Sequence, residues 1–349
     1  MLNKNKSLSF QLDVSDFLPA DESEKQSIDI MRESVSFWKD GFRRLARNKL
    51  AMISLFTIIV VMIFAFIVPS FYPYSYEQQI RGSENLYLME YSGEELARIE
   101  AGEKVFPHIL GTDNLGRDTA IRIMMGSRIS LLVGIIASAI ILIIGSLYGA
   151  IAGYFGGKVD LYMMRLVDII YTVPDILVII LLSVTLKYPL RSLADTVPGF
   201  GWISTVGVGL ISIFIVFSLL YWVGMARIVR GQILTLKEQE FVTAARALGA
   251  SHSRIIKNHL LTNCVGTLIV TTTLQIPSSI FTESFLSFLG LGVNAPMPSL
   301  GSLAAQAVGG MNSYPHRLLA PAIAISIIIL SFNLLGDGLR DAFDPRLKN

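Results

Sequence analysis

The sequence has few of the residues from which most metal, redox and nucleotide sites are built. It contains one cysteine, Cys264, and four histidines among 349 residues, which excludes a disulfide within the chain and a cysteine-based metal site. It has no G-x-x-x-x-G-K-[ST] motif, so a phosphate-binding loop of that type is missing. The net charge of +2 gives no basis for nucleic-acid binding. We therefore expect no catalytic centre, metal site or cofactor on this chain.

Charged residues are also scarce, and long apolar runs take their place. Only 16% of the residues are charged and 52% are hydrophobic, whereas soluble proteins average about 25% charged residues. A membrane-spanning helix needs roughly 20 mostly apolar residues. Six runs meet this requirement: Leu50–Ser70, Ser130–Ala152, Leu166–Leu186, Thr205–Gly224, Thr262–Gly290 and Leu318–Leu335. The sequence thus predicts an all-α polytopic membrane protein with about six transmembrane helices, and Cys264 is expected to pack inside the fifth.

The distribution of Lys and Arg predicts which side of the membrane each segment faces. Basic residues are enriched in cytoplasmic segments near the ends of spans. Here they gather before the first run, between the fourth and fifth, and after the sixth: Lys39, Arg43, Arg44, Arg47 and Lys49; Arg227, Arg230, Lys237, Arg246, Arg254 and Lys257; Arg340, Arg346 and Lys348. We expect both termini in the cytoplasm and no cleavable signal peptide, because acidic residues precede the first apolar run.

This topology divides the chain into four parts: a cytoplasmic segment 1–49, a first transmembrane helix 50–72, an extracytoplasmic loop 73–128 and a transmembrane domain 129–349. In the first part, Phe37–Leu45 has the pattern of a short amphipathic helix at the inner membrane surface; a solvated leader is the alternative. In the loop, Ser92 and Glu95 have the spacing of a capping box. Gly102 is expected to end the short helix that they start.

The segment between the fourth and fifth runs predicts a helix, a sharp turn and a returning helix on the cytoplasmic side. One stripe of the first helix has the spacing i, i+3, i+4, i+7 and consists of Phe241, Ala244, Ala245 and Leu248. Gly249 suits the left-handed conformation that ends a helix, and Ser251 or Ser253 can cap the next one. The second helix turns Ile255, Ile256 and Leu260 towards the membrane. This pattern favours a docking element for another protein, with an amphipathic loop on lipid or on its own bundle as the alternative.

The stretch Glu240-Phe-Val-Thr-Ala-Ala-Arg-Ala-Leu-Gly249 resembles the coupling loop, or EAA motif, of bacterial ABC importer permeases. In that family the loop seats in a cleft of the ATP-hydrolysing subunit. The resemblance assigns this role, within a coupling loop 240–261, to Glu240, Phe241, Ala244, Ala245, Arg246, Leu248, Gly249, Ser251 and Arg254. Two residues depart from the family pattern: Thr243 replaces a glutamate, and Thr262 replaces a proline that often follows the return helix.

Three further segments resemble the oligopeptide and dipeptide permease branch of this family. They are His108–Asp118 with its continuation to Leu131, Glu283–Gly292 followed by Pro296, Pro298 and Ser299, and Gly336–Arg346. The resemblance implies a type I ABC importer permease fold and the second, C-type permease subunit of a peptide importer in the bacterial cytoplasmic membrane. It implies four partners besides lipid and peptide: a homologous permease that completes a heterodimer, two ATPase subunits that hold ATP and Mg, and an extracytoplasmic substrate-binding protein.

Two further groups of residues are candidates for contact with substrate or with the binding protein. The polar fifth run, interrupted by Pro277, predicts a broken helix that lines the pathway; packing through small polar residues is the alternative. The residues of this group are Thr272, Gln275, Ser278, Ser279 and Glu283. The family position of Asp113, Arg117 and Asp118 implies an external docking rim. The spacing does not fit an EF-hand, and an Asx-type turn at Asp113 is the structural interpretation.

Other functions remain open at this level. A secondary transporter usually needs charged relays deep in its bundle, but the runs hold few ionisable residues, chiefly Asp168 and Glu283, each close to an interface. A membrane scaffold or receptor would not need the polar fifth run. Nickel, an opine or another small solute is the alternative to a peptide as substrate.

Overall fold

The computed structural model describes residues 36–293 and 297–343. Pro296, Arg346 and Lys348, which the sequence analysis used, lie outside these residues. The secondary structure of the described part is helical, with isolated bridges at Glu90–His108 and Thr112–Asp118 in place of strands. Its helices confirm the predicted number of spans, because six are long and apolar enough to cross a membrane: Lys49–Ser70, Thr119–Phe155, Asp175–Thr196, Val208–Leu236, Val265–Phe288 and His316–Phe343.

The chain forms two units, Met1–Asp40 and Gly41–Asn349. Helix α2 (Phe37–Arg47) begins in the first unit and ends in the second, which confirms the helix expected over Phe37–Leu45. Its position at a membrane surface stays a prediction. Within the second unit, α3 (Lys49–Phe66) starts at Asn48, whose side chain accepts a hydrogen bond of 3.2 Å from the backbone N–H of Ala51.

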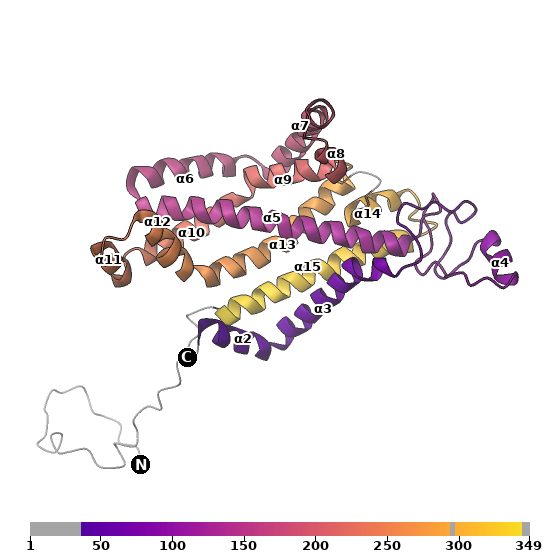
Figure 1. The fold of residues 1–349 in the computed structure, drawn as a ribbon, viewed down its shortest axis with the longest axis horizontal. Helices are drawn as coiled ribbons and strands as arrows, with labels where there is room; N and C mark the ends of the chain where they lie inside the picture. Colours follow the sequence, from indigo (N-terminus) through magenta and orange to yellow (C-terminus); the bar gives the residue numbers. More distant parts are fainter. Residues whose placement is uncertain (1–35, 294–296, 344–349) are drawn as a thin grey trace, which may run out of the picture. The chain divides into compact units, whose positions relative to one another are not determined.

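The longest helix, α5 (Thr119–Phe155), is the centre of the second unit. Its 37 residues span about 55 Å at 1.5 Å per residue, which exceeds the roughly 30 Å hydrocarbon core of a bilayer. Helices α3, α10 (Trp222–Leu236), α13 (Val265–Phe288) and α15 (His316–Phe343) all pack against it (Figure 1). The helix therefore reaches from the bundle into the segment 71–118.

Three glycines bring α5 and α10 into close contact. Gly145, Gly149 and Gly153 recur every four residues on one face of α5, a spacing that lets helix backbones approach each other in membranes. A Cβ on Gly145 would lie 2.6 Å from the Cβ of Met225, and one on Gly149 would collide with the carbonyl oxygen of Ala226. Larger side chains on this face would thus separate the two helices.

The third span differs from the predicted run Leu166–Leu186. The structure has two helices there, α6 (Gly157–Thr172) and α7 (Asp175–Thr196), separated at Val173 and Pro174. Val173 adopts an extended conformation because a residue before proline is disfavoured in the helical region. The span is α7 alone. Asp168 therefore belongs to α6, where its carboxylate accepts a hydrogen bond of 2.8 Å from Arg227.

The predicted break of the fifth span at Pro277 is also wrong. Helix α13 continues through Pro277 as one helix, because a single proline removes one hydrogen bond and the turns on either side keep theirs. The chain direction changes at the ends of α13 instead. Cys264, which is buried, caps its start. At its end Gly290 has a φ of +74° and the N–H of Leu291 bonds to the carbonyl of Leu286.

Shorter helices lie at the two ends of this unit. Near one end are α11 (Glu240–Ala247), α12 (His252–Arg254) and the π-helical segment η3 (Ile255–Leu261), and near the other are α4 (Gly93–Glu100) and α14 (Leu300–Val308) (Figure 1). The remaining elements are η2 (Val68–Ser70), α8 (Trp202–Val206) and α9 (Val208–Leu220), and α9 forms the fourth span together with α10. Candidate sites thus occur at both ends of α5.

Candidate functional site

The turn between α11 and α12 has the geometry predicted from its glycine. Gly249 has a φ of +78°. The N–H of Ala250 bonds to the carbonyl of Ala245, and the N–H of Gly249 bonds to that of Arg246, each at 3.0 Å. This pair of bonds is a Schellman motif, which satisfies the last carbonyls of a helix. The chain therefore reverses direction here through a hydrogen-bonded turn.

The predicted stripe of α11 divides between two faces of the helix. Val242 and Ala245 are buried against the rest of the chain, with 0% and 9% of their surface exposed. Phe241 is 39% exposed and Leu248 is 89% exposed. Leu248 therefore presents an apolar side chain to solvent at the tip of an ordered turn. Val242, which anchors the helix, was not singled out by the sequence analysis.

The turn is held on the last turn of α5. Ser251 caps α12, because its hydroxyl accepts from the N–H of Arg254 at 3.4 Å. The next residue, His252, forms a hydrogen bond of 2.8 Å through Nδ1 with the hydroxyl of Tyr154. The guanidinium of Arg246 lies 5.9 Å from the Tyr154 ring centre, within the range of a cation–π contact. No local pattern indicates the role of Tyr154, since its partner is 98 residues away.

The return segment is anchored by the apolar residues expected there. Ile255, Ile256 and Leu260 are all buried. The segment η3 is π-helical, and Thr262 caps its end. The hydroxyl of Thr262 donates to the carbonyl of Lys257 at 3.1 Å. Proline, the residue common at this position in the family, has no hydroxyl to make this bond. Since π-helical turns are frequent at functional sites, the connection from α12 to α13 is part of the candidate site.

The residues predicted to line a pathway do not share one surface. Glu283 is 0% exposed, and its carboxylate accepts hydrogen bonds from Ser130 and Ser287, each at 2.7 Å. Because Ser130 belongs to α5, its bond joins α13 to α5, whereas Ser287 lies in α13 itself. Ser279 is buried and Ser278 is exposed. Thr272 and Gln275 are intermediate.

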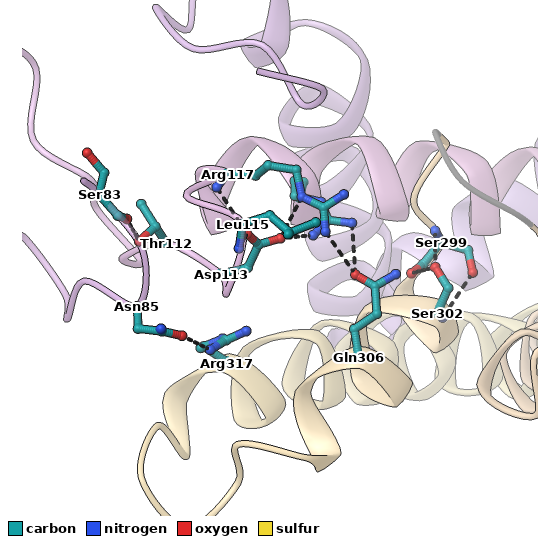
Figure 2. Close-up of polar contacts among 11 residues, drawn as sticks. Ser83, Asn85, Thr112, Asp113, Leu115, Arg117, Ser299, Ser302, Gln306 and Arg317 are labelled. Atoms are coloured by element: carbon teal, nitrogen blue, oxygen red, sulfur yellow. Dashed lines mark hydrogen bonds and ion pairs between the residues drawn. The ribbon is translucent and has the colours of Figure 1, made fainter. Parts of the chain in front are cut away.

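The residues predicted as an external rim are largely withdrawn from solvent. Asp113 and Asp118 are buried, with residue exposures of 7% and 1%, and Arg117 is partly buried, with 13% of its side chain exposed. All three side chains form contacts within the chain. Oδ1 of Asp113 accepts from the N–H groups of Leu115 at 2.8 Å and Arg117 at 3.0 Å, which confirms the Asx-type turn. Figure 2 shows this carboxylate facing Arg117. A docking role for these side chains stays a prediction. Since they bond within the chain, they would act by shaping the surface around them.

A second cluster joins the starts of two helices through His108. The Nδ1 of His108 lies 2.7 Å from Asp118, the N-cap of α5, and its Nε2 lies 3.1 Å from Glu95. Glu95 completes the capping box of α4 with Ser92, as predicted. Carboxylates only accept hydrogen bonds, so this geometry suits a ring that carries a proton on both nitrogens. His108 could not be recognised from the sequence as part of this cluster, because nothing in the spacing relates it to Glu95.

Burial and charge act in opposite directions on His108. Burial alone lowers the pKa of the imidazole, but the hydrogen bond and charge of Asp118, together with those of Glu95, raise this pKa above its usual value of 6.5. The ring of Tyr74 stacks on His108 at 4.5 Å between centres. Burial, with the charges of Glu95 and Asp118, raises the pKa of Tyr74 to about 12. The described residues include no group of three or more His, Cys, Asp or Glu arranged to hold a metal ion.

Comparison with known proteins gives consistent results. Residues 145–349 match the model of the binding-protein-dependent transport system inner membrane component, and residues 36–88 match that of the N-terminal transmembrane domain of oligopeptide transport permease C. The chain is 40% identical, over 95% of its length, to the oligopeptide transport system permease protein OppC of Bacillus subtilis and to the dipeptide transport system permease protein DppC of the same organism, covering 97% and 93% of those proteins. It is 38% identical to OppC of Haemophilus influenzae, with 90% of each chain covered.

These similarities agree with the six apolar helices and with the motifs on which the sequence analysis rested. The first family model covers more than half of the chain, and the similar proteins extend over nearly all of it. The protein is a multi-pass membrane protein, and it belongs to the family of binding-protein-dependent transport system inner membrane components.

Proposed function

We propose that this chain is the second, C-type permease subunit of a peptide importer driven by ATP. The relatives named for oligopeptide and dipeptide transport support peptides as the substrate class, since both are 40% identical to this chain over 95% of its length. Transport requires the membrane-spanning bundle, which this chain supplies. The ATP and Mg are held by partner subunits, and this chain provides the surface on which an ATPase subunit docks.

The exposed tip of the α11–α12 turn carries this proposal. Leu248 is 89% exposed, whereas Val242 on the opposite face is fully buried and fixes the helix against the bundle. A rigid apolar side chain that projects from an anchored base fits a pocket on another protein. Basic residues on the same segment, including Arg246, Arg254 and Lys257, favour the cytoplasmic side, where ATP is available. The partner at this turn is therefore an ATPase subunit.

Coupling follows from what the turn is connected to. The segments η3 and α13 follow α12 along the chain. Tyr154 of α5 forms a hydrogen bond with His252 of α12. Closure of two ATPase subunits around ATP moves the turn, and the attached helices switch between inward- and outward-facing states. A ligand shifts such an equilibrium only through its different affinity for the two states, which ATP binding supplies on the partner.

The remaining partners occupy other surfaces of the chain. A homologous permease completes the heterodimer, and the polar residues Gln275 and Ser278 of α13 line the pathway between the two permeases. The 71–118 segment lies on the opposite end of α5 from the turn (Figure 1), so it faces the extracytoplasmic binding protein. The buried carboxylates of Asp113 and Asp118 stabilise the conformation of this segment through their hydrogen bonds.

A charge at the tip of the turn tests the proposal. Leu248→Arg in the assembled transporter should lower peptide uptake and the amount of ATPase subunit that co-purifies by tenfold or more, since buried anchors at an interface are each worth about 2 kcal/mol or more. Leu88→Arg is the matched control for ATPase retention alone, because Leu88 is also exposed, at 50%, but lies in the 71–118 segment, at the other end of α5 from the turn (Figure 1). Normal uptake and ATPase retention in Leu248→Arg would contradict the docking assignment. Uptake that competes with nickel and not with peptides would contradict the substrate class.

A further inference from the structure

A small cavity lies where the 71–118 segment meets α5, α14 and α15. Its volume is about 20 Å³, and a cavity needs roughly 10–15 Å³ to hold one water molecule. The polar side chains that line it are Asp113, Thr119, Arg122, Gln306 and Arg317. The cavity therefore has room for a small occupant of about the size of a water molecule.

Positive charge exceeds negative charge around this cavity. Two guanidinium groups, those of Arg117 and Arg122, contact the single carboxylate of Asp113, and a third, that of Arg317, also lines the cavity. Oδ2 of Asp113 accepts from Arg122 and, at 2.7 Å, from Arg117, while Oδ1 is taken by backbone N–H groups. Arg317 donates to the neutral amide oxygen of Asn85 at 2.7 Å. Figure 2 shows Arg317 directed at Asn85, apart from Asp113.

Two hydrogen-bond donors in the cavity wall are left without acceptors. Arg122 and Thr119 are only 3% and 7% exposed, and within the described part of the chain Nε of Arg122 and Oγ1 of Thr119 have no hydrogen-bond partner. The oxygen of Gln306 already accepts from Arg122 at 3.1 Å and from Arg117 at 3.3 Å. A buried donor without an acceptor costs free energy. An occupant of the cavity that accepts hydrogen bonds from both groups would remove this cost.

The helix that carries these donors adds to the positive potential. Thr119 is the first residue of α5, and the N-terminus of a helix bears about half a positive charge. The neighbouring carboxylate of Asp118 is turned to His108 and to the N–H of Ile121. Apolar side chains, among them Leu303 and Pro321, complete the wall, and a less polar surrounding strengthens the attraction for an anion.

We propose that this cavity is a binding site for one monovalent anion of the size of chloride, held by Nε of Arg122 and Oγ1 of Thr119. Its charge offsets part of the excess that Arg122 and Arg317 bring to the cluster. Water satisfies the two donors but leaves that excess in place, and a cation would increase it. Because the anion contacts residues from the start of α5 and lies beside Arg317 of α15, its binding stabilises the junction of these helices with the 71–118 segment.

Bromide reports the site directly, because its anomalous scattering distinguishes it from water. Crystals of the assembled transporter grown in bromide should give an anomalous peak in the cavity, within contact distance of Arg122 and Thr119. The thermal unfolding midpoint should also rise, in a saturable manner, when chloride replaces gluconate at constant ionic strength. A cavity without an anomalous peak, or equal midpoints in the two salts, would overturn the proposal and leave water as the occupant.

Thr119→Val removes one ligand with little change in shape. The concentration of chloride that gives half of the stabilisation should increase by about tenfold or more, since a hydrogen bond to a charged group is worth about 1.5–3 kcal/mol. Thr196→Val serves as the control, because Thr196 is exposed and its hydroxyl bonds to the carbonyl of Ser192 in its own helix. An unchanged chloride dependence in Thr119→Val would contradict the assigned ligand. The bromide measurement on the unaltered protein stands even if this variant does not fold.

Discussion

Replacing His108 by glutamine tests whether the imidazole joins α4 to α5 as a cation. The substitution removes the positive charge between Glu95 and Asp118 and leaves a side chain that donates to only one of them at a time. Both carboxylates are nearly fully buried, with residue exposures of 4% and 1%. His108→Gln should therefore loosen the 71–118 segment without altering the membrane-spanning helices.

The size of the effect follows from the burial of the cluster. Removing one partner of a buried ion pair costs about 3–5 kcal/mol, because the remaining charge stays buried. Since 1.4 kcal/mol corresponds to a factor of ten, hydrogen exchange in α4 and in residues 105–118 should accelerate by about 100-fold to a few thousand-fold. Arg98→Gln is the matched control. It breaks the ion pair of Arg98 with Glu103, which lies in the same segment but is largely exposed, and should leave exchange unchanged.

The pH dependence has a defined sign. The pKa of His108 is raised in the folded protein, so the protonated ring stabilises the fold, fully below the unfolded value of about 6.5. This contribution is lost as the pH rises through the raised pKa. The groups that face the ring are Glu95, Asp118 and Tyr74, and the hydroxyl of Tyr72 donates to Asp118 at 3.4 Å.

Hydrogen exchange followed by mass spectrometry measures both effects on the full-length protein. After correction for intrinsic exchange rates, protection of α4 in the unaltered protein should decline as the pH is raised above 6.5, and in His108→Gln it should be low and flat. Parallel pH profiles for the two proteins would refute the assignment of His108 as the titrating group. Equal protection at pH 6 would refute the role of the imidazole in joining the helices.

Three further substitutions have expected outcomes. Gly249→Val should lower the substrate-stimulated ATPase activity of the assembled complex several-fold, because a left-handed conformation costs an L-residue about 1–2 kcal/mol. Gly249→Asn should keep most of this activity. A steric clash does not contribute, since nothing lies within 4 Å of a Cβ placed at this position. Gly149→Val should lower the thermal unfolding midpoint, since forcing extra atoms between α5 and α10 costs about 1–3 kcal/mol. Glu283→Ala should also lower it, because each buried hydroxyl left unpaired, at Ser130 and Ser287, costs about 1–3 kcal/mol.

Each of these results has an outcome that would contradict it. Equal activity of the valine and asparagine variants at position 249 would mean that the turn does not depend on its left-handed residue. An unaltered midpoint in Gly149→Val would mean that α5 and α10 are not held at the distance seen here. An unaltered midpoint in Glu283→Ala would mean that the hydrogen bonds from Ser130 and Ser287 do not stabilise the bundle.

Features that depend on neighbours in the sequence could be predicted. The apolar runs gave the six spans, and the spacing of Ser92 and Glu95 gave the capping box of α4. Gly249 gave the turn after α11. In each case the signal lies within one or two helical turns, where local conformation decides the structure.

Features that depend on distant residues could not be predicted. The hydrogen bond between Tyr154 and His252 joins residues 98 positions apart, and that between Arg122 and Gln306 spans 184. Asp113 and Asp118 have the composition of an exposed polar turn, but partners beyond the turn allow their burial: Arg122 for Asp113 and His108 for Asp118, nine and ten residues away. The separation of α6 and α7 at Pro174 was missed for a different reason. The run Leu166–Leu186 is apolar on average, and this average conceals that proline restricts the conformation of the residue before it.

The length of α5 has a mechanical consequence. One end of this helix holds the turn at Tyr154, and the other carries Arg122 and Thr119 beside the cavity. A helix of 37 residues acts as a lever: a tilt of about 5° around its midpoint displaces each end by about 2 Å, in opposite directions, given a length of about 55 Å. A small push on the turn would therefore change the spacing around the cavity and the His108 cluster without any bending of the helix.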